Sequence, residues 1–443
     1  MISKQKKPLK RFQAGVELEF FLVDGNGIIV PKADELLKRI TKKFRDLDAT
    51  YEGFQELLEI RSYSHTRLRK SLLDLLKDVR TLSLEAGRMG LHLFPLGTYP
   101  GSYFPTRTQK KRYKIHSEVF GGERYYRTFG KICGFHFHYS MPKGVFDYRK
   151  RFLRTSYQSA NMERLLSSFN FLVAADPAIA TLLQSSPFID QRFVAKDSRL
   201  VISRANEGFL HHNEVWSGRE TLVRLPSYFS TAHDLVENLN QKHKVWVEEL
   251  VKHGFGEEAR RKERLDRIWA PVKVNKIGTL EARGMDMNHP KYVAPMAVLL
   301  KHSLAEIQER GLRPKPCDYG IKEPFKVEGD RLLVPPSSYV RNTLQPLSAY
   351  MGFEDKLIHN YVRHFLRFAK NLLPRGYDKA IAPLQEMVSR KKTVSDKLLE
   401  RVKKMGYALD NTIPQNVCHE LALHTAEKMS KELDETIARL PEE

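Results

Sequence analysis

Carboxylates spaced two residues apart are the first candidates for chemistry in this sequence. Residues 15–21, Gly-Val-Glu-Leu-Glu-Phe-Phe, have the composition of a strand, and side chains two apart on a strand point to the same face. Glu17 and Glu19 would therefore lie side by side. Because like charges repel, a cation is expected to offset them. Taken alone, such a pair is more often the solvent-facing side of an amphipathic strand.

Three further strand-like segments repeat this spacing, and each alone also has a structural explanation as a surface ion pair or a structural histidine pair. If the four strands share a sheet, one face carries too much charge for a core and too much order for a random surface. The residues on that face would be Glu17, Glu19, Glu59, Arg61, His136, His138, Glu281 and Arg283.

Such a face predicts a metal and phosphate site. Oxygen ligands with one or two imidazoles suit magnesium or manganese better than zinc, and arginines hold phosphate or carboxylate in a bidentate manner. The set could therefore clamp a triphosphate and stabilise charge during phosphoryl transfer. The sequence has no P-loop, no Gly-x-Gly-x-x-Gly and no Gly-x-Ser-x-Gly elbow that would favour another nucleotide fold or a serine hydrolase.

The elements that must position these residues follow from hydrophobic periodicity. We expect an α+β fold: a mostly antiparallel sheet with one acidic face, helices packed on the other face, and a helical C-terminal region. Residues 1–336 would form the catalytic domain and residues 337–443 the helical region. Expected strands cover residues 12–23, 55–61, 91–97, 132–140 and 278–285, and expected helices cover 33–47, 68–89, 159–183, 232–255 and 292–310.

The charge balance of the sequence indicates which kinds of partner the protein could bind. Lys and Arg outnumber Asp and Glu by 74 to 53, which gives a net charge of +21. This excess raises the question of nucleic acid, but the basic clusters at 110–112, 260–262 and 390–392 are short, and no nucleic-acid-binding motif accompanies them. The same charge suits an enzyme whose substrate is a polyanion such as a nucleotide.

Three widely separated cysteines indicate a reducing compartment, and the basic start of the chain lacks the apolar stretch of a secretory signal. No apolar run approaches the roughly 18–20 residues of a membrane helix. We therefore expect a cytoplasmic protein without a membrane partner, and leave open whether it forms a homo-oligomer.

At these motifs the sequence resembles the glutamate–cysteine ligase type 2 family of carboxylate-amine ligases, whose wider superfamily has the catalytic fold of glutamine synthetase. The similar segments are Gly15 to Phe20, Glu52 to Ile60, Gly134 to His138, Ser185-Ser186-Pro187 and Gly278 to Arg283 followed by Asp286. Each motif is weak alone, but their order and spacing over residues 12–310 make the set specific.

The resemblance implies ATP-driven activation of a carboxylate to an acyl phosphate, which an amine then attacks to form an amide, such as a γ-glutamyl bond. Arg283 and Glu281 would be catalytic, and Arg61, Arg204 and Lys273 would bind the nucleotide. ATP and Mg²⁺ or Mn²⁺ would be the cofactors, and an amino acid carboxylate and an amine the substrates. The implied metal ligands are Glu17, Glu19, Glu52, Glu59, His136, His138 and Glu281.

The sequence departs from the family after Ser185-Ser186-Pro187, where Asp197-Ser198-Arg199 and Ile202-Ser203-Arg204 are only loose counterparts of a Tyr-Arg segment. Two alternatives stay open: a phosphotransferase acting on a guanidino or amino substrate with the same fold, and a non-catalytic basic protein that binds nucleic acid. The intact carboxylates argue against the second. Specificity would depend on segments 99–130 and 186–230.

Overall fold

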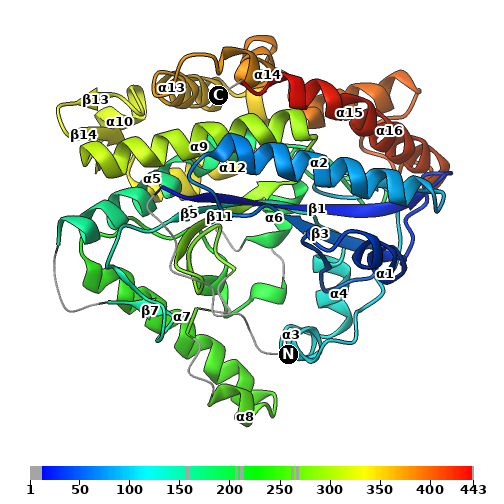
Figure 1. Cartoon of the computed structure of the whole chain (residues 1–443), viewed down its shortest axis with the longest axis horizontal. Helices are drawn as coiled ribbons and strands as arrows, with labels where there is room; N and C mark the ends of the chain where they lie inside the picture. The colour runs from blue at the N-terminus through cyan, green and yellow to red at the C-terminus, as the bar shows by residue number, and fades with distance from the viewer. Residues whose placement is uncertain are drawn as a thin grey trace.

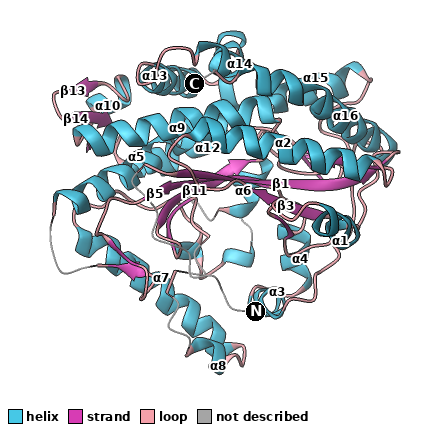
Figure 2. Cartoon of the chain, viewed as in Figure 1, coloured by secondary structure: helices cyan, strands magenta, loops and turns pink. Residues whose placement is uncertain are grey.

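A seven-stranded sheet divides the molecule into two layers of helices (Figures 1 and 2). The computed structural model describes residues 12–154, 159–204, 208–209, 214–260, 264–265 and 269–441. The basic residues before residue 12 and part of the basic cluster at 260–262 lie outside these ranges.

All strand pairs of the sheet are antiparallel, as expected. The strand order is β10-β11-β5-β1-β3-β2, and β4 pairs with the far end of β1. The strands are β1 (Ala14–Asp24), β2 (Ala49–Tyr51), β3 (Leu57–Arg61), β4 (Leu91–Phe94), β5 (Gly134–Ser140), β10 (Val272–Asn275) and β11 (Thr279–Asp286).

The alternation of β1 explains the two unlike faces of the sheet. Val16, Leu18 and Phe20 are fully buried in the core, whereas Glu17 and Glu19 between them are only partly buried. From Phe20 to Val23 the residues on both faces of the strand are buried, and in this stretch β4 pairs with β1. One face of the central strand is thus apolar throughout and the other begins with two carboxylates.

Helices cover the apolar face, and α5 is the most buried of them. They are α2 (Leu68–Gly87), α5 (Ala160–Leu183) and α9 (Pro290–Arg310). Pro177 lies inside α5 without ending it. Among the described residues α5 alone is long and apolar enough to cross a membrane, which corrects the expectation that no segment would be; its whole apolar window is buried in the molecule, as in a core helix.

On the opposite side of the sheet shorter elements and one long helix surround the acidic face (Figure 1). They are α1 (Ala33–Lys43), α3 (Lys111–Val119), α4 (Glu123–Phe129), α6 (Ser198–Ser203), α7 (Ala232–Lys252) and α8 (Gly256–Ala259), with the 3₁₀ turns η1 (Glu214–Trp216) and η2 (Glu220–Leu222). A cluster of aromatic rings joins α3 to α7: Phe120 stacks on Trp246 at 5.6 Å between ring centroids. The segment 99–130 is therefore partly helical, although its sequence shows no strong period.

Three small sheets and one short helix lie outside the seven-stranded sheet. The two-stranded sheets are β6 (Phe146–Asp147) with β7 (Phe152–Leu153) and β8 (Phe188–Ile189) with β9 (Arg192–Phe193). The three-stranded sheet contains β12 (Arg313–Pro316), β13 (Val327–Glu328) and β14 (Arg331–Val334), with α10 (Tyr319–Lys322) beside it.

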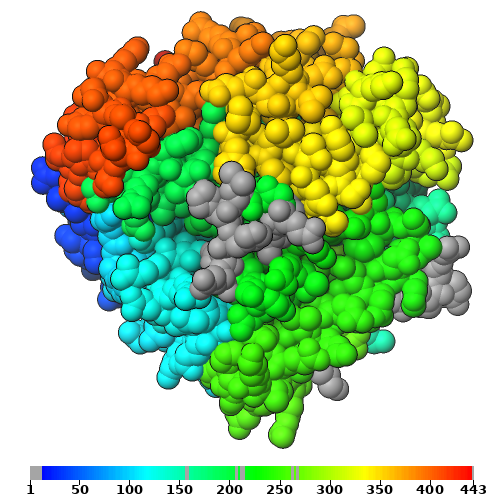
Figure 3. All heavy atoms as spheres, turned by 180° about the vertical axis from the view of Figure 1, so that it is seen from behind, coloured from blue at the N-terminus to red at the C-terminus, as the bar shows by residue number. Residues whose placement is uncertain are grey.

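The described residues after 336 are helical and pack on the outer helix layer. They form α11 (Ser337–Tyr339), the π-turn η3 (Val340–Leu344), α12 (Gln345–Met351), the 3₁₀ turn η4 (Gly352–Glu354), α13 (Lys356–Lys370), α14 (Asp378–Arg390), α15 (Val394–Lys404) and α16 (Gln415–Arg439). Helices α12 and α13 contact α5, and α14 and α16 contact α9. Seen from behind, their yellow to orange surface lies directly against green residues of the earlier part (Figure 3). The division of the chain into two domains at residue 336 stays a prediction.

One buried ion pair ties the helical region to the rest. Arg204 donates two hydrogen bonds to Asp176 of α5, at 2.7 and 3.0 Å, and one to the carbonyl of Gly284 in β11. Gln345 of α12 donates to the same carboxylate at 2.7 Å. The pair therefore joins α5, the end of α6, β11 and α12.

We predict that Asp176→Ala lowers the free energy of unfolding by about 3–5 kcal/mol, because it leaves the Arg204 guanidinium buried without a counter-ion. Urea denaturation followed by circular dichroism measures this. As a control, Arg310→Gln removes one partner of an exposed helical ion pair and should change stability by less than about 1 kcal/mol. Equal effects of the two substitutions would contradict the structural role of the buried pair.

Candidate active site

The antiparallel register brings the acidic residues of β1 and β3 together with the first histidine of β5. Glu17 lies opposite Arg61 of β3 on one side and opposite His136 of β5 on the other. Glu19 lies opposite Glu59. Because alternate residues share a face, the register places these five side chains on one side of the sheet.

The same face continues across β5 to β11 and β10. Glu281 of β11 lies opposite His138 of β5 and, on its other side, opposite Lys273 of β10. A bulge follows between Ala282 and Met285, where the register shifts. The two halves of the site therefore meet at the histidine strand.

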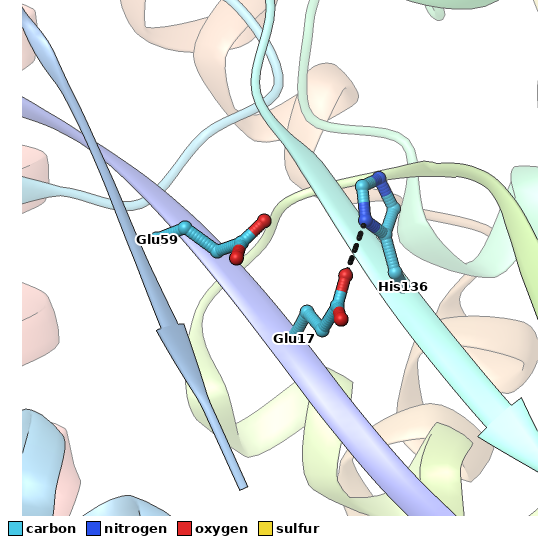
Figure 4. A group of neighbouring side chains, drawn as sticks. All are labelled: Glu17, Glu59 and His136. Atoms are coloured by element: carbon cyan, nitrogen blue, oxygen red, sulfur yellow. Dashed lines mark hydrogen bonds and ion pairs between the residues drawn. The ribbon is translucent and has the colours of Figure 1, made fainter. Parts of the chain in front are cut away.

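Glu17, Glu59 and His136 form the centre of the site (Figure 4). One ligand atom from each lies within 4.8 Å of the others. The Nδ1 atom of His136 is 3.2 Å from a carboxylate oxygen of Glu17. Glu59 and His136 are buried, and Glu17 is the most accessible of the three. Three donor groups from three adjacent strands thus converge on one point.

Two further carboxylates flank this centre. Glu19 Oε1 is 3.6 Å from Nε2 of His136, and the backbone N–H of Gly134 donates to the other oxygen of Glu19. Glu52, from the segment between β2 and β3, accepts a hydrogen bond of 2.8 Å from the Tyr113 hydroxyl of α3. Glu52 is close enough to Glu59 to form a side-chain hydrogen bond with it.

The carboxyl groups of this cluster differ in pKa. Burial, and then the negative charges of Glu52 and Glu17, raise the pKa of Glu59 well above its ordinary value. Burial also raises the pKa of Glu19, although His136 opposes the shift. Burial acts in the same direction on Glu17, but the neighbouring histidines outweigh it and hold the pKa of Glu17 well below its ordinary value. The cluster therefore has more negative charge than its own histidines can neutralise.

His138 links the cluster to Glu281. Its Nε2 is 3.4 Å from Glu17, and its Nδ1 is 2.9 Å from the Thr279 hydroxyl. Burial alone would lower the pKa of His138, but the charges of Glu17 and Glu281 raise it above its ordinary value. The ring is thus poised between two carboxylates on different strands.

Cations surround Glu281. Its two oxygens lie 3.2 Å from the Lys273 ammonium and 3.2 Å from the Arg283 guanidinium, and Asn275 also donates to it. Burial opposes ionisation of Glu281, but the charges of Lys273 and Arg283 prevail and lower its pKa far below the ordinary value. Burial lowers the pKa of Lys273 to about 8, despite the attraction of Glu281.

The donor set fits a hard divalent cation. Several carboxylates and one or two imidazoles face one another without enough positive charge among the described residues, and such oxygen-rich sets suit Mg²⁺ or Mn²⁺ rather than Zn²⁺. A cation would remove the repulsion that raises the pKa of Glu59. The residues that could hold it are Glu17, Glu19, Glu52, Glu59, His136 and His138, with Glu281 at the far end of the face.

The predicted nucleotide-binding residues are separated. Lys273 lies on the site face, and Arg61 lies at its edge, where it donates to Asp48 at 2.7 Å and reaches within 3.5 Å of Glu59. Arg204 is buried, and its guanidinium is occupied by Asp176 and the Gly284 carbonyl. The structure gives Arg204 a positioning task behind β11, so its predicted contact with the nucleotide finds no support in the geometry.

Arg199 is a site residue that the sequence did not single out. It belongs to α6, is buried, and donates to the Arg283 carbonyl at 3.3 Å, while its charge acts on Glu19 and Asp286. A Cβ atom at Gly134 would lie 2.4 Å from its guanidinium, so a larger residue at this position would displace the Arg199 side chain. The only sequence signal was the loose family likeness of Asp197-Ser198-Arg199, which carries no information about burial.

The chain is similar in sequence to a known protein family. The sequence model of a family described as glutamate-cysteine ligase family 2 matches residues 13–328. A curated protein of Chromobacterium violaceum with the provisional name glutamate–cysteine ligase 2 is 30% identical over 144 residues, which cover 32% of this chain and 36% of that protein. The chain thus matches little more than a third of the length of this relative.

Two solved structures share the fold. The glutamate–cysteine ligase of Francisella tularensis, solved in complex with AMP, has a TM-score of 0.52 and 14% identity, and the match covers 97% of this chain and 91% of that one. A bifunctional glutathione synthetase from Pasteurella multocida has a TM-score of 0.55 and 13% identity, and covers 97% of this chain and 54% of that one. These matches confirm the predicted fold class.

We predict that Glu59→Gln weakens Mn²⁺ binding by at least about tenfold, since even residues that only support metal ligands contribute that much. Calorimetric titration measures the affinity. In chelator at neutral pH the same substitution should raise the melting temperature, because it removes a charge that the buried cluster disfavours. Glu56→Gln is the control: Glu56 is equally buried but accepts a hydrogen bond from the Thr106 N–H, so Mn²⁺ affinity should not change. Wild-type affinity in Glu59→Gln would exclude Glu59 as a ligand.

A second prediction concerns pH. The raised pKa values of Glu19 and Glu59 mean that the folded protein holds protons that the unfolded chain has already lost, and a bound cation must displace them. We expect Mn²⁺ affinity to rise with pH above the ordinary carboxyl range and binding to release protons. Titration in buffers of different ionisation enthalpy counts the released protons. An affinity independent of pH would contradict the raised values.

Proposed function

This chain belongs to glutamate-cysteine ligase family 2, and from that premise we propose that it is an ATP-dependent carboxylate–amine ligase. The observation that carries the proposal is the shared sheet face: carboxylates and histidines at one end, and Glu281 with Lys273 and Arg283 at the other. Such a face can hold divalent cations beside a group that donates to phosphate oxygens. The family supplies the reaction class, and the site supplies groups suited to it.

In this proposal the central cluster would hold two or three Mg²⁺ or Mn²⁺ ions. Bound ions would supply charge neutralisation for the phosphates of ATP. The protein's own contribution is to present Glu17, Glu59 and His136 from three rigid strands, so that little rearrangement is needed when ions and nucleotide bind. Glu281 would complete the set at the end nearest the basic residues.

Arg283 and Lys273 would contact the transferred phosphoryl group. Each already lies 3.2 Å from Glu281, which fixes the side chains, yet a guanidinium has five N–H donors and an ammonium three. The N–H groups of Arg283 and Lys273 that do not contact Glu281 can donate hydrogen bonds to phosphate oxygens as negative charge develops on those oxygens. Arg199, which donates to the Arg283 carbonyl, would position this backbone segment.

The proposed reaction has two steps. A substrate carboxylate oxygen attacks the terminal phosphorus of ATP, which forms an acyl phosphate and releases ADP. The amine nitrogen then attacks the acyl carbon, the bond to the phosphate oxygen breaks, and the amine loses a proton, so that amide and inorganic phosphate result. The first substrates to test are L-glutamate and L-cysteine, after the names of the relatives.

We predict that ADP release by the wild type requires both a carboxylate and an amine substrate, and that Glu281→Gln lowers it by at least about a hundredfold, as loss of a group that stabilises the transition state does. A coupled assay for ADP, with mass spectrometry of the amide, measures both.

The exposed Glu248→Gln in α7 is the control and should keep full activity. ADP release that persists without a carboxylate but needs an amine or guanidine would replace the ligase by a phosphotransferase. Full activity of Glu281→Gln would exclude its proposed role.

A further inference from the structure

A cavity of about 480 Å³ lies between β9 and the loop that joins α15 to α16. Its volume falls within the roughly 300–1,000 Å³ that is usual for small-molecule sites. It is lined by Arg192 and Phe193 of β9 and by residues 409–412 of the loop, none of which belongs to the acidic face. Helices α15 and α16, which flank the loop, lie on the other side of the sheet from α3 and α7 (Figure 1). The cavity is therefore separate from the candidate active site.

Hydrogen bonds tie the two walls of this cavity together. The backbone N–H of Ile413 donates to the carbonyl of Gln191 at 2.8 Å, and the side-chain amide of Gln191 donates to the carbonyl of Ile413 at 2.7 Å. The backbone N–H of Gln191 also donates to the carbonyl of Pro100 at 2.9 Å. Since Gln191 and Ile413 each adjoin a lining residue, the cavity is a fixed part of the fold rather than a gap between two independent segments.

The apolar part of the lining belongs to a small hydrophobic core. Phe193 and Leu409 are half-buried, and both pack against a cluster that is separate from the main core and joins β8 to α15 and α16. The buried members of this cluster are Phe188, Leu399, Val402, Ile413, Val417, Cys418 and Leu421. An apolar group in the cavity would cover the exposed parts of Phe193 and Leu409 and so extend this small core.

The charged part of the lining consists of one cation and one anion. Arg192 and Asp410 are both exposed, and neither forms an ion pair or a side-chain hydrogen bond with any residue that the structure describes. The side chains of Asn411 and Thr412 also lack such bonds within the described ranges. A single exposed charge without a partner is common. Opposite charges that line one cavity without pairing to each other form instead a complement to a ligand that carries both charges.

We propose that this cavity is a second ligand site, which binds a zwitterionic α-amino acid with an apolar side chain. The Arg192 guanidinium would hold the carboxylate in a bidentate manner, and Asp410 would accept hydrogen bonds from the ammonium. The apolar side chain of the ligand would lie against Phe193 and Leu409. This site is additional to the proposed ligase function and does not rest on it.

The first test uses three probes that differ only in their charged groups. L-Leucine carries both charges, 4-methylpentanoate lacks the ammonium, and 3-methylbutylamine lacks the carboxylate. Calorimetric titration of the full-length protein measures the three affinities. We expect L-leucine to bind at least about tenfold more tightly than either analogue, because each analogue lacks one charge-assisted interaction.

The second test assigns each charged group of the ligand to one side chain. Arg192→Gln should lower the affinity for L-leucine to that for the amine and leave the amine unaffected. Asp410→Asn should lower it to that for the carboxylate and leave the carboxylate unaffected. Arg313→Gln and Asp330→Asn, which break an exposed ion pair at the three-stranded sheet, are the matched controls and should bind L-leucine as the wild type does. Neither Arg192→Gln nor Asp410→Asn should change the melting temperature without ligand, because both side chains are exposed and unpaired among the described residues.

Three outcomes would overturn this second site: a wild type that does not bind L-leucine, a wild type that binds it no better than the two analogues, and unchanged affinity for L-leucine in both cavity variants. Glu281→Gln separates the second site from the candidate active site, and it should leave the affinity for L-leucine unchanged. A protein that binds L-leucine through Arg192 and Asp410 but makes no amide would overturn the proposed ligase reaction and support the second site.

Discussion

Repulsion among buried carboxylates on one sheet face is the constraint on which this structure depends. Two charges about 4 Å apart interact by roughly 4 kcal/mol at an effective dielectric constant of 20. Glu17 escapes this through its histidines, but Glu59 and Glu19 do not, and their pKa values rise. A cation held by these oxygens would remove the repulsion and so would stabilise the central sheet.

The register of the sheet fixes the face on which these carboxylates lie. In β1 the residues that alternate with Glu17 and Glu19 are fully buried under α2 and its neighbours, and a register slip by one residue would exchange the two faces. The other five strands of the sheet, β2, β3, β4, β10 and β11, flank β1 and β5 and fix their place in the sheet. The energy of the apolar core therefore holds the acidic face together against its own repulsion.

Spacing in the sequence predicted this face well, because period-two alternation survives any tertiary arrangement of the strands. Glu17, Glu59 and His136 meet, and Glu281 lies on the same face beyond His138, as expected for that reason. Contacts that depend on packing between distant elements were not predictable: Arg204 is bound by Asp176 in the interior, and Arg199 enters the site from a short helix. The helices within residues 99–130 and the strand β10 were missed because each is short and weakly periodic.

The charges of the site are also distributed unevenly, with an acidic end and a basic end on the same sheet face. Carboxylates dominate at β1 and β3, while the cations Lys273 and Arg283 lie beside Glu281. A polyanion that brings its own cations can satisfy both ends at once, with ions against the carboxylates and free phosphate oxygens against the basic side chains. Neither a bare cation nor a bare anion can do so. This polarity, rather than the chain's overall positive charge, is the feature that favours a metal-bound nucleotide in the proposed reaction, whose phosphoryl transfer would then take place near Glu281, where the two ends meet.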